Sequence, residues 1–209
     1  MRLLVAGASG RTGRLFVARA VERGHDVTVL VRDARSFSAK KDRVTVVVGD
    51  VLEPGTLAAA VTGQDAVVSL LAPRPRTDGR VYVEGTRNLA DAAVRAGVRR
   101  FVAVSAEGAG VDPRRLTIAY RLVRWIPVVA RLYPDIARMD AELRSRDDLD
   151  WTVVRPAILT NGAQTGGYRE VQGAVVPGGQ SLSRADLSAF LLEVVEGRSH
   201  LCTTVAVAY

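Results

Sequence analysis

The chain has 209 residues, of which 48% are hydrophobic, and a formal net charge of +7 at pH 7. This length and composition predict one domain, residues 1–209, with a sizeable apolar core. No apolar run approaches the ~18 residues of a membrane span, and the chain enters a predicted strand at once, so we expect neither a membrane segment nor a signal peptide. The single cysteine, Cys202, excludes an internal disulfide and is typical of a cytoplasmic protein. Its place in an apolar C-terminal strand predicts a packed core thiol.

The positive charge does not by itself indicate a nucleic-acid-binding protein. Lys40 and Lys41 are the only lysines, and the other basic side chains are arginines scattered along predicted helices. No module that interleaves basic and aromatic residues accompanies them. The charge is therefore better explained by an arginine-biased composition and a site for an anionic cofactor.

Three glycines at the start of the chain carry the strongest signal. Residues 3–6 predict a buried strand, Gly7, Gly10 and Gly13 follow it, and a helical pattern then runs to Gly24. A strand, a glycine turn and a helix in this order direct free backbone N–H groups at an anion. We expect Gly7 to allow a sharp turn, Gly10 to admit a pyrophosphate and Gly13 to let helix and strand pack closely. The sequence thus predicts nucleotide binding, the alternative being a glycine-rich turn without a ligand.

The second predicted strand, residues 27–31, indicates which nucleotide binds. An NAD-preferring site would place an acidic residue at its end, about 20 residues after the glycines. This chain has Arg32 there, and Arg11 of the glycine turn is close enough in sequence to approach the same place. Two guanidinium groups suit a 2′-phosphate, so the pattern favours NADPH over NADH. The alternative is that Arg32 is an ordinary solvated arginine.

Strand and helix patterns alternate along the rest of the chain. A helix opened by Pro54 is expected between the third and fourth strands. The pattern predicts an α/β, single-domain, Rossmann-type doubly wound parallel sheet with helices on both faces. The other predicted strands are residues 44–48, 66–71, 101–104, 151–154 and 203–207, and the next long helix is residues 80–96.

Two further segments have their own patterns. Ser183 and Asp186 resemble a capping box before a helix with one apolar face. The apolar, arginine-dotted segment of residues 113–133 interrupts the alternation, and Pro127 is expected to end or kink a helix within it. This segment is either a pair of helices that covers the core, or a substrate-side cover or subunit contact.

Ligands of such sheets bind beyond the carboxyl ends of the strands, near the point where the strand order reverses. The positions expected at this edge are Gly7, Gly10, Gly13, Arg32, Asp50, Val51, Leu71, Ala72 and Ser105.

Together these residues resemble the atypical short-chain dehydrogenase/reductase superfamily, and more narrowly its NmrA-like group, which includes biliverdin-IXβ reductase, also called flavin reductase. The motifs that carry the resemblance run in order along nearly the whole chain. They are residues 7–13 (GASGRTG), 29–33 (VLVRD), 48–51 (VGDV), 63–67 (GQDAV), 84–88 (EGTRN), 165–168 (TGGY) and 183–187 (SRADL).

The resemblance implies a set of cofactor contacts. The pyrophosphate and adenosine would be held by Gly7, Ser9, Gly10, Arg11, Thr12 and Gly13. Arg32 would bind the 2′-phosphate, Asp50 and Val51 would flank the adenine, and Leu71 and Ala72 would line the ribose. Pro156, Ala157 and Ile158 would contact the nicotinamide carboxamide, and Ser105 would lie nearby. Arg74 and Ala106 would stand on the substrate side.

The catalytic residues of the superfamily have no complete counterpart in this chain. Its dehydrogenases use Ser, Tyr and Lys, with Tyr-x-x-x-Lys on one helix face lowering the phenol pKa. No lysine follows residue 41, so Tyr120 with Arg124 is only a near match, and Tyr120 also fits a core or lid position. The family serine falls on Ser105 or, shifted by one, on Ala106.

Hydride transfer to a planar acceptor needs less protein chemistry, because the cofactor supplies the reaction and solvent can supply the proton. The leading hypothesis is a cytoplasmic, metal-free, NADPH-dependent reductase of flavins, quinones or tetrapyrrole-like acceptors, acting as a monomer or homodimer. The alternatives are an NmrA-like sensor that binds NADP(H) without turnover, and a biosynthetic tailoring reductase or cyclase.

Overall fold

An eight-stranded, mostly parallel sheet forms the centre of the protein, with the strand order β3-β2-β1-β4-β5-β6-β10-β8. The computed structural model describes residues 1–38, 42–72, 79–109, 126–173, 175–197 and 199–209. The chain builds β1, β2 and β3 outward in one direction, and β4, β5 and β6 in the other. The strand order therefore reverses between β1 and β4, which confirms the doubly wound topology. The strands of this sheet are β1 (Arg2–Ala6), β2 (Asp26–Val31), β3 (Val44–Val48), β4 (Ala66–Ser69), β5 (Arg100–Val104), β6 (Asp150–Pro156), β8 (Arg169–Gln172) and β10 (Thr203–Ala208).

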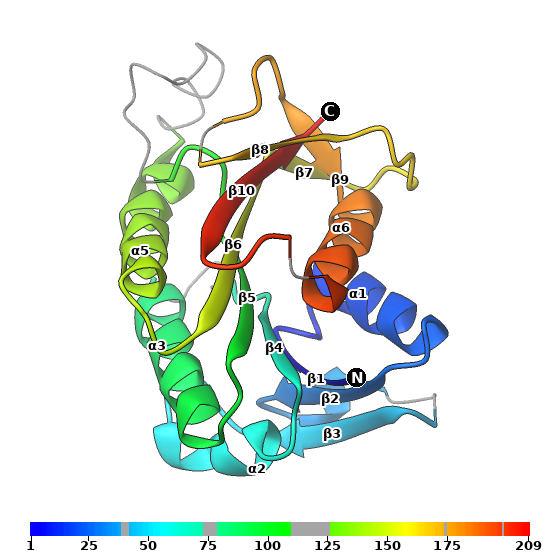
Figure 1. Ribbon diagram of the computed structural model, residues 1–209, viewed down its shortest axis with the longest axis vertical. Coiled ribbons are helices and arrows are strands. Elements are labelled where there is room, and N and C mark those ends of the chain that lie inside the picture. The colour runs from blue at the N-terminus through cyan, green and yellow to red at the C-terminus, as the bar shows by residue number, and fades with distance from the viewer. Residues whose placement is uncertain (39–41, 73–78, 110–125, 174, 198) are drawn as a thin grey trace.

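Helices cover both faces of the sheet (Figure 1). Helices α1 and α6 pack against each other on one face, and α3 and α5 pack together on the other, with α2 beside α3. The helices are α1 (Arg11–Glu22), α2 (Ala58–Val61), α3 (Arg80–Arg95), α5 (Pro127–Arg144) and α6 (Arg184–Glu196). None of them, within the described residues, is long and apolar enough to cross a membrane.

The alternation of side chains along β1 divides the core into two layers. Leu3 and Val5 pack in the cluster beneath α1 and α6, whereas Leu4 and Ala6 pack in the cluster beneath α2, α3 and α5. All four side chains are fully buried. A strand that is apolar at every position is expected when helices cover both faces of a parallel sheet.

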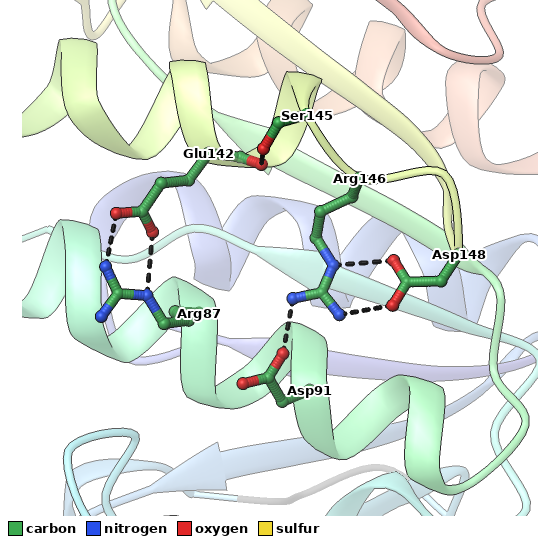
Figure 2. Close-up of polar contacts among 6 residues, drawn as sticks. All are labelled: Arg87, Asp91, Glu142, Ser145, Arg146 and Asp148. Atoms are coloured by element: carbon green, nitrogen blue, oxygen red, sulfur yellow. Dashed lines mark hydrogen bonds and ion pairs between the residues drawn. The ribbon is translucent and has the colours of Figure 1, made fainter.

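Ion pairs fasten α3 to α5 at their outer surface (Figure 2). Arg87 of α3 pairs with Glu142 of α5, and its Nε donates to a Glu142 carboxylate oxygen over 3.0 Å. Beyond the end of α5, Arg146 joins Asp91 of α3 to Asp148. These pairs add orientation to a helix contact that buried apolar side chains such as Leu89 and Met139 stabilise.

Three local predictions are wrong. Cys202 is exposed, with a φ of 51°, because it lies in the turn before β10 and not in the strand. Pro127 does not kink a helix but occupies the first turn of α5, where its missing N–H costs nothing, and residues 110–125 before it lie outside the described ranges. Pro54 opens only a short 3₁₀ turn, Pro54–Thr56, ahead of α2.

The prediction also missed three short strands. They are β8, which pairs antiparallel with β10, and β7 (Ile158–Thr160) and β9 (Ser181–Ser183), which form a separate two-stranded sheet.

Asp186 is buried at the start of α6, where its carboxylate accepts hydrogen bonds from several parts of the chain. Ser183 caps the helix as predicted, because its hydroxyl accepts the Asp186 amide over 2.9 Å. The carboxylate of Asp186 accepts the Tyr209 hydroxyl at 2.6 Å and the Gly166 amide at 2.8 Å, and also the Thr165 amide. Burial alone would raise its pKa, but these hydrogen bonds outweigh burial and lower the pKa from 3.8 to about 2. Asp186 thus joins the loop at residues 165–166 and Tyr209 to α6.

We predict that Asp186→Asn lowers the free energy of unfolding near pH 7 by about 2 kcal/mol. Because folding depresses this pKa, the ionised carboxylate stabilises the native protein above about pH 4, and the stabilisation is lost as the pH falls toward about 2. Denaturant unfolding of both proteins at several pH values tests this. Asp26→Asn is the control, since Asp26 makes only an exposed pair with Arg43. An Asn variant with the stability and acid sensitivity of the native protein would contradict the prediction.

Candidate functional site

A pocket of about 500 Å³ opens at the carboxyl ends of β1, β2, β3 and β4, where the strand order reverses. Most of the residues predicted to hold a dinucleotide line it. The lining residues are Ala6, Gly7, Ser9, Gly10, Arg14, Leu30, Arg32, Ser36, Gly49, Asp50, Val51, Leu52, Leu70, Leu71, Ala72 and Val81.

The glycine turn forms the floor of this pocket because no side chain fits there. Gly7 has a φ of +85°, and a Cβ built on it would lie 2.3 Å from the carbonyl oxygen of Leu70. A Cβ on Gly13 would lie 2.3 Å from the carbonyl oxygen of Gly7. Gly10 is the N-cap of α1, and the first turn of that helix contains no acidic residue. The positive end of the helix therefore faces the pocket with its amides available to an anion.

Two arginines give the pocket a positive rim. Arg32 follows β2, is exposed, and makes no hydrogen bond or ion pair with any residue that the structure describes. Arg14 is held in place: its Nε donates to the Ser9 carbonyl at 3.1 Å, its Nη2 donates to the Ser36 carbonyl at 2.8 Å, and its guanidinium lies over the Phe37 ring. A positioned guanidinium beside an unpaired one suits a phosphate group.

The loop after β3 forms the opposite wall. The Asp50 carboxylate accepts the Leu52 amide at 2.9 Å, which fixes this turn. The side-chain amide of Asn88 donates to the Val51 carbonyl at 2.9 Å, and a Cβ on Gly85 would lie 2.7 Å from the Val51 side chain. Helix α3 thus holds Val51 against the pocket, where an apolar side chain can contact a purine ring.

The other predicted positions have separate environments. Arg11 is exposed, and its charge acts on Arg184 at the start of α6, while Thr12 and Gly13 belong to the first turn of α1. Arg14, one turn further along, takes the place on the rim that the sequence suggested for Arg11. Arg74 and Tyr120 lie outside the described residues, as do residues 113–125 of the predicted cover.

A second group of predicted positions gathers at the carboxyl ends of β5 and β6. Ser105 directly follows β5, is buried, and donates its amide to the Val154 carbonyl at 2.8 Å. Pro156 and Ala157 are buried at the end of β6, and Ile158 is half-exposed beyond them. Ala106 is partly buried next to Ser105. The structure brings these predicted positions together along the same edge of the sheet as the pocket, although they do not line it.

A buried ion pair lies beneath Ser105. Arg155 of β6 donates through Nε and Nη2 to one carboxylate oxygen of Asp140 on α5, Oδ2, at 2.8 and 2.5 Å. The Ser105 hydroxyl lies 3.5 Å from the same oxygen. Burial raises the pKa of Asp140, against the opposing effects of Arg155, Arg144 and Ser105.

Sequence reasoning missed Arg14, Asp140 and Arg155. A signal existed for Arg155, since a charged residue inside the apolar run before Pro156 must find a buried partner. For Asp140 and Arg14 the sequence holds no comparable signal, because the fold alone brings Ser105 to Asp140 and Ser36 to Arg14.

The comparisons with known proteins agree with this geometry. A family model described as NAD(P)H-binding matches residues 7–198, so the chain belongs to this NAD(P)H-binding family. The photosystem II assembly factor Ycf39 of Synechocystis is 31% identical over 166 residues, which are 78% of this chain and 46% of that protein. This chain thus spans less than half the length of that relative. The uncharacterised protein YwnB of Bacillus subtilis is 29% identical over 210 residues, 96% of this chain and 94% of that protein.

Among solved structures, a short-chain dehydrogenase/reductase of Veillonella parvula in complex with NADP is similar, with a TM-score of 0.83. The match covers 100% of this chain and 94% of that chain. At 19% identity, this likeness shows the fold alone.

We predict that Gly7→Ala lowers the free energy of unfolding by about 2 kcal/mol or more, because the new Cβ adopts a strained φ and meets the Leu70 carbonyl. The turn moves in response, so dinucleotide affinity falls as well. Thermal unfolding and a fluorescence titration measure the two effects. Gly55→Ala is the control, since a Cβ there meets no atom within 4 Å. Native stability and affinity in the Gly7 variant would contradict this account of the turn.

Proposed function

We propose that this protein is an NADPH-dependent oxidoreductase that passes a hydride to a planar acceptor, of the flavin, quinone or tetrapyrrole type. The observation that carries the proposal is the pocket at the strand-order reversal, with a glycine floor and two arginines on its rim. Membership of the NAD(P)H-binding family and the resemblance to a solved NADP complex support the same cofactor class.

In this proposal the amides at the start of α1 bind the pyrophosphate, and Asp50 with Val51 flanks the adenine. Arg32 and Arg14 bind the 2′-phosphate, Arg32 from the open side and Arg14 from its fixed place over Phe37. Leu71 and Ala72 line the ribose, and the nicotinamide extends toward Ser105, Pro156, Ala157 and Ile158. NADPH, when bound, supplies the hydride.

The residues near Ser105 then orient the nicotinamide and leave space for a second ring. Small side chains favour this arrangement, since Ala72, Ala106 and Ala157 add little bulk and the half-exposed Ile158 offers an apolar surface. Holding two rings face to face accounts for much of the rate of a hydride transfer. The Tyr-x-x-x-Lys pair is absent, which favours a planar acceptor over an alcohol.

We predict a preference for NADPH that depends on the two rim arginines. Losing a charged hydrogen bond to the 2′-phosphate costs about 1.5–3 kcal/mol, so Arg32→Ala should weaken NADPH binding by about tenfold to a hundredfold and leave NADH binding nearly unchanged. Dissociation constants for both dinucleotides test this. The control is Arg35→Ala, because Arg35 is a neighbouring exposed arginine that pairs with Asp33 and does not line the pocket. Equal affinity of the native protein for both dinucleotides would end the claim.

We also predict slow, acceptor-dependent oxidation of NADPH with FMN, riboflavin or a quinone, followed at the nicotinamide absorbance band. Ser105→Ala should reduce this rate without abolishing it, because the bound dinucleotide still meets the acceptor. Tyr120→Phe should keep most of the turnover, since no lysine stands at the Tyr-x-x-x-Lys spacing to activate that phenol. A loss of about a hundredfold in the Tyr120 variant would instead identify a catalytic acid.

A second candidate is a protein that binds NADP(H) without turnover and acts through a partner. The likeness to Ycf39, described as an assembly factor, favours it. The two candidates make opposite predictions for one experiment: tight NADPH binding with no oxidation across the whole acceptor panel supports the binding role alone.

A further inference from the structure

Two arginines stand at the starts of α1 and α6, the helices that pack together on one face of the sheet. Arg11 is the first residue of α1, and Arg184 is the first residue of α6. The Ser188 hydroxyl joins the two starts, because it donates to the Arg184 carbonyl at 2.7 Å and lies 3.4 Å from the Thr12 carbonyl oxygen. Both arginines therefore lie next to the dinucleotide pocket, although neither of them lines it.

Neither arginine has a carboxylate partner among the residues that the structure describes. Arg11 is exposed and makes no hydrogen bond or ion pair with any of them. Asp186, two residues further along α6, uses its carboxylate to accept from Tyr209 and Gly166 instead. Burial lowers the pKa of the Arg184 guanidinium, and the charge of Arg11 lowers it further. Two neighbouring positive charges without a counter-charge cost free energy, which a bound anion would remove.

Arg184 is held in place and still has donors to offer. It is partly buried, and its Nη1 donates to the Asn161 side-chain oxygen at 2.8 Å and to the Leu159 carbonyl at 3.3 Å. Its Nε and Nη2 donate to none of the described residues. A guanidinium that is fixed on one side keeps its remaining N–H groups in a set direction, so it loses little conformational entropy when it binds a ligand.

The place of this pair favours the acceptor as the source of the anion. Leu159 directly follows Ile158 in β7, and the proposed function puts Ile158 against the nicotinamide. Since adjacent strand residues are about 3.3 Å apart, Arg184 is hydrogen-bonded to backbone close to the expected nicotinamide ring. In the same proposal the α1 amides bind the pyrophosphate, and Arg32 and Arg14 bind the 2′-phosphate. Arg11 and Arg184 are thus left for an anionic group of the second molecule.

We propose that Arg11 and Arg184 bind a phosphate group of the acceptor, and that the preferred acceptor is therefore a phosphorylated flavin of the FMN type. This inference rests on the proposed reductase function and narrows its acceptors. A phosphate monoester carries a charge of about −1.5 to −2 at pH 7, which matches two guanidinium groups, whereas a carboxylate matches only one. Its oxygen atoms can also accept from both guanidinium groups at once. Riboflavin and quinones carry no such group.

Binding without turnover tests this site. FMN and riboflavin share the ring system and the ribityl chain and differ only in the phosphate, and quenching of flavin fluorescence by the NADP⁺-saturated protein gives both dissociation constants. The native protein should bind FMN about a hundredfold more tightly than riboflavin. Arg11→Ala and Arg184→Ala should each weaken FMN binding about tenfold, the lower end of the effect of a lost charged hydrogen bond, and leave riboflavin binding nearly unchanged. The double variant should bind both flavins about equally.

Two controls separate phosphate binding from a general effect of charge or folding. Arg95→Ala removes an exposed arginine from the last turn of α3, far along that helix from the carboxyl edge of the sheet, and should leave both affinities unchanged. Arg11→Ala breaks no hydrogen bond between described residues, so it tests the site even if Arg184→Ala disturbs residues 159–161. The preference for FMN should also shrink as the ionic strength rises, because salt screens exposed charges.

The possible failures are distinguishable. Equal affinity of the native protein for FMN and riboflavin would overturn the inference. Weaker NADP⁺ binding in the two variants, with an unchanged ratio of the flavin affinities, would also overturn it, because the arginines would then bind the pyrophosphate of the dinucleotide. Tight, phosphate-dependent binding of FMN without any oxidation of NADPH would overturn the reductase function and leave the phosphate site standing.

Discussion

The contact between the β1–α1 turn and the end of β4 is the constraint on which the rest of the site depends. Gly7 approaches the Leu70 carbonyl so closely that no side chain fits between them. This contact joins the two halves of the doubly wound sheet where their strand orders diverge. The pocket lies directly above it, with the loop after β3 on one side and residues 70–72 on the other. The shape of the pocket is therefore set by backbone packing in the sheet, and dinucleotide affinity and folding stability are coupled at this point.

The buried ion pair between Asp140 and Arg155 costs free energy of desolvation. Removing a carboxylate and a guanidinium from water costs several kcal/mol for each ion, and a well-packed apolar pair is often as stable or more stable. The Asp140–Arg155 pair lacks the bidentate geometry that strengthens such pairs, since Nε and Nη2 of Arg155 both reach Oδ2 of Asp140. Stability alone is thus a weak explanation for these residues. The Arg87–Glu142 pair also uses a carboxylate of α5, but it is partly exposed, so water solvates its charges.

Much of the fold was predictable from the sequence, since each long element carries its own local signal. The apolar runs of β1, β2, β5 and β6, the helix at residues 80–96 and the Ser183 cap needed no knowledge of distant contacts. The short strands β7, β8 and β9 were missed because three or four residues hold no clear period, and their pairing depends on residues that lie elsewhere in the chain. Cys202 was misplaced for a related reason: the apolar pattern continues through the turn, and only the backbone reveals where β10 begins.

The candidate site likewise has one part with a local sequence signal and one part without. The nucleotide half consists of the glycines and of residues that directly follow β2 and β3, so it could be predicted from the spacing of the strands. The half beyond β5 and β6 is assembled from Ser105, Asp140 and Arg155, which are brought together by the packing of α5 on the sheet and have no common motif. The comparisons also agree on the cofactor and not on the role: the family model is defined by NAD(P)H binding, whereas the relatives include an assembly factor. The glycine turn and the pocket therefore support the cofactor class, whereas the choice of acceptor is expected to depend on the edge formed by β5, β6 and α5, which continues through β7 to Arg184.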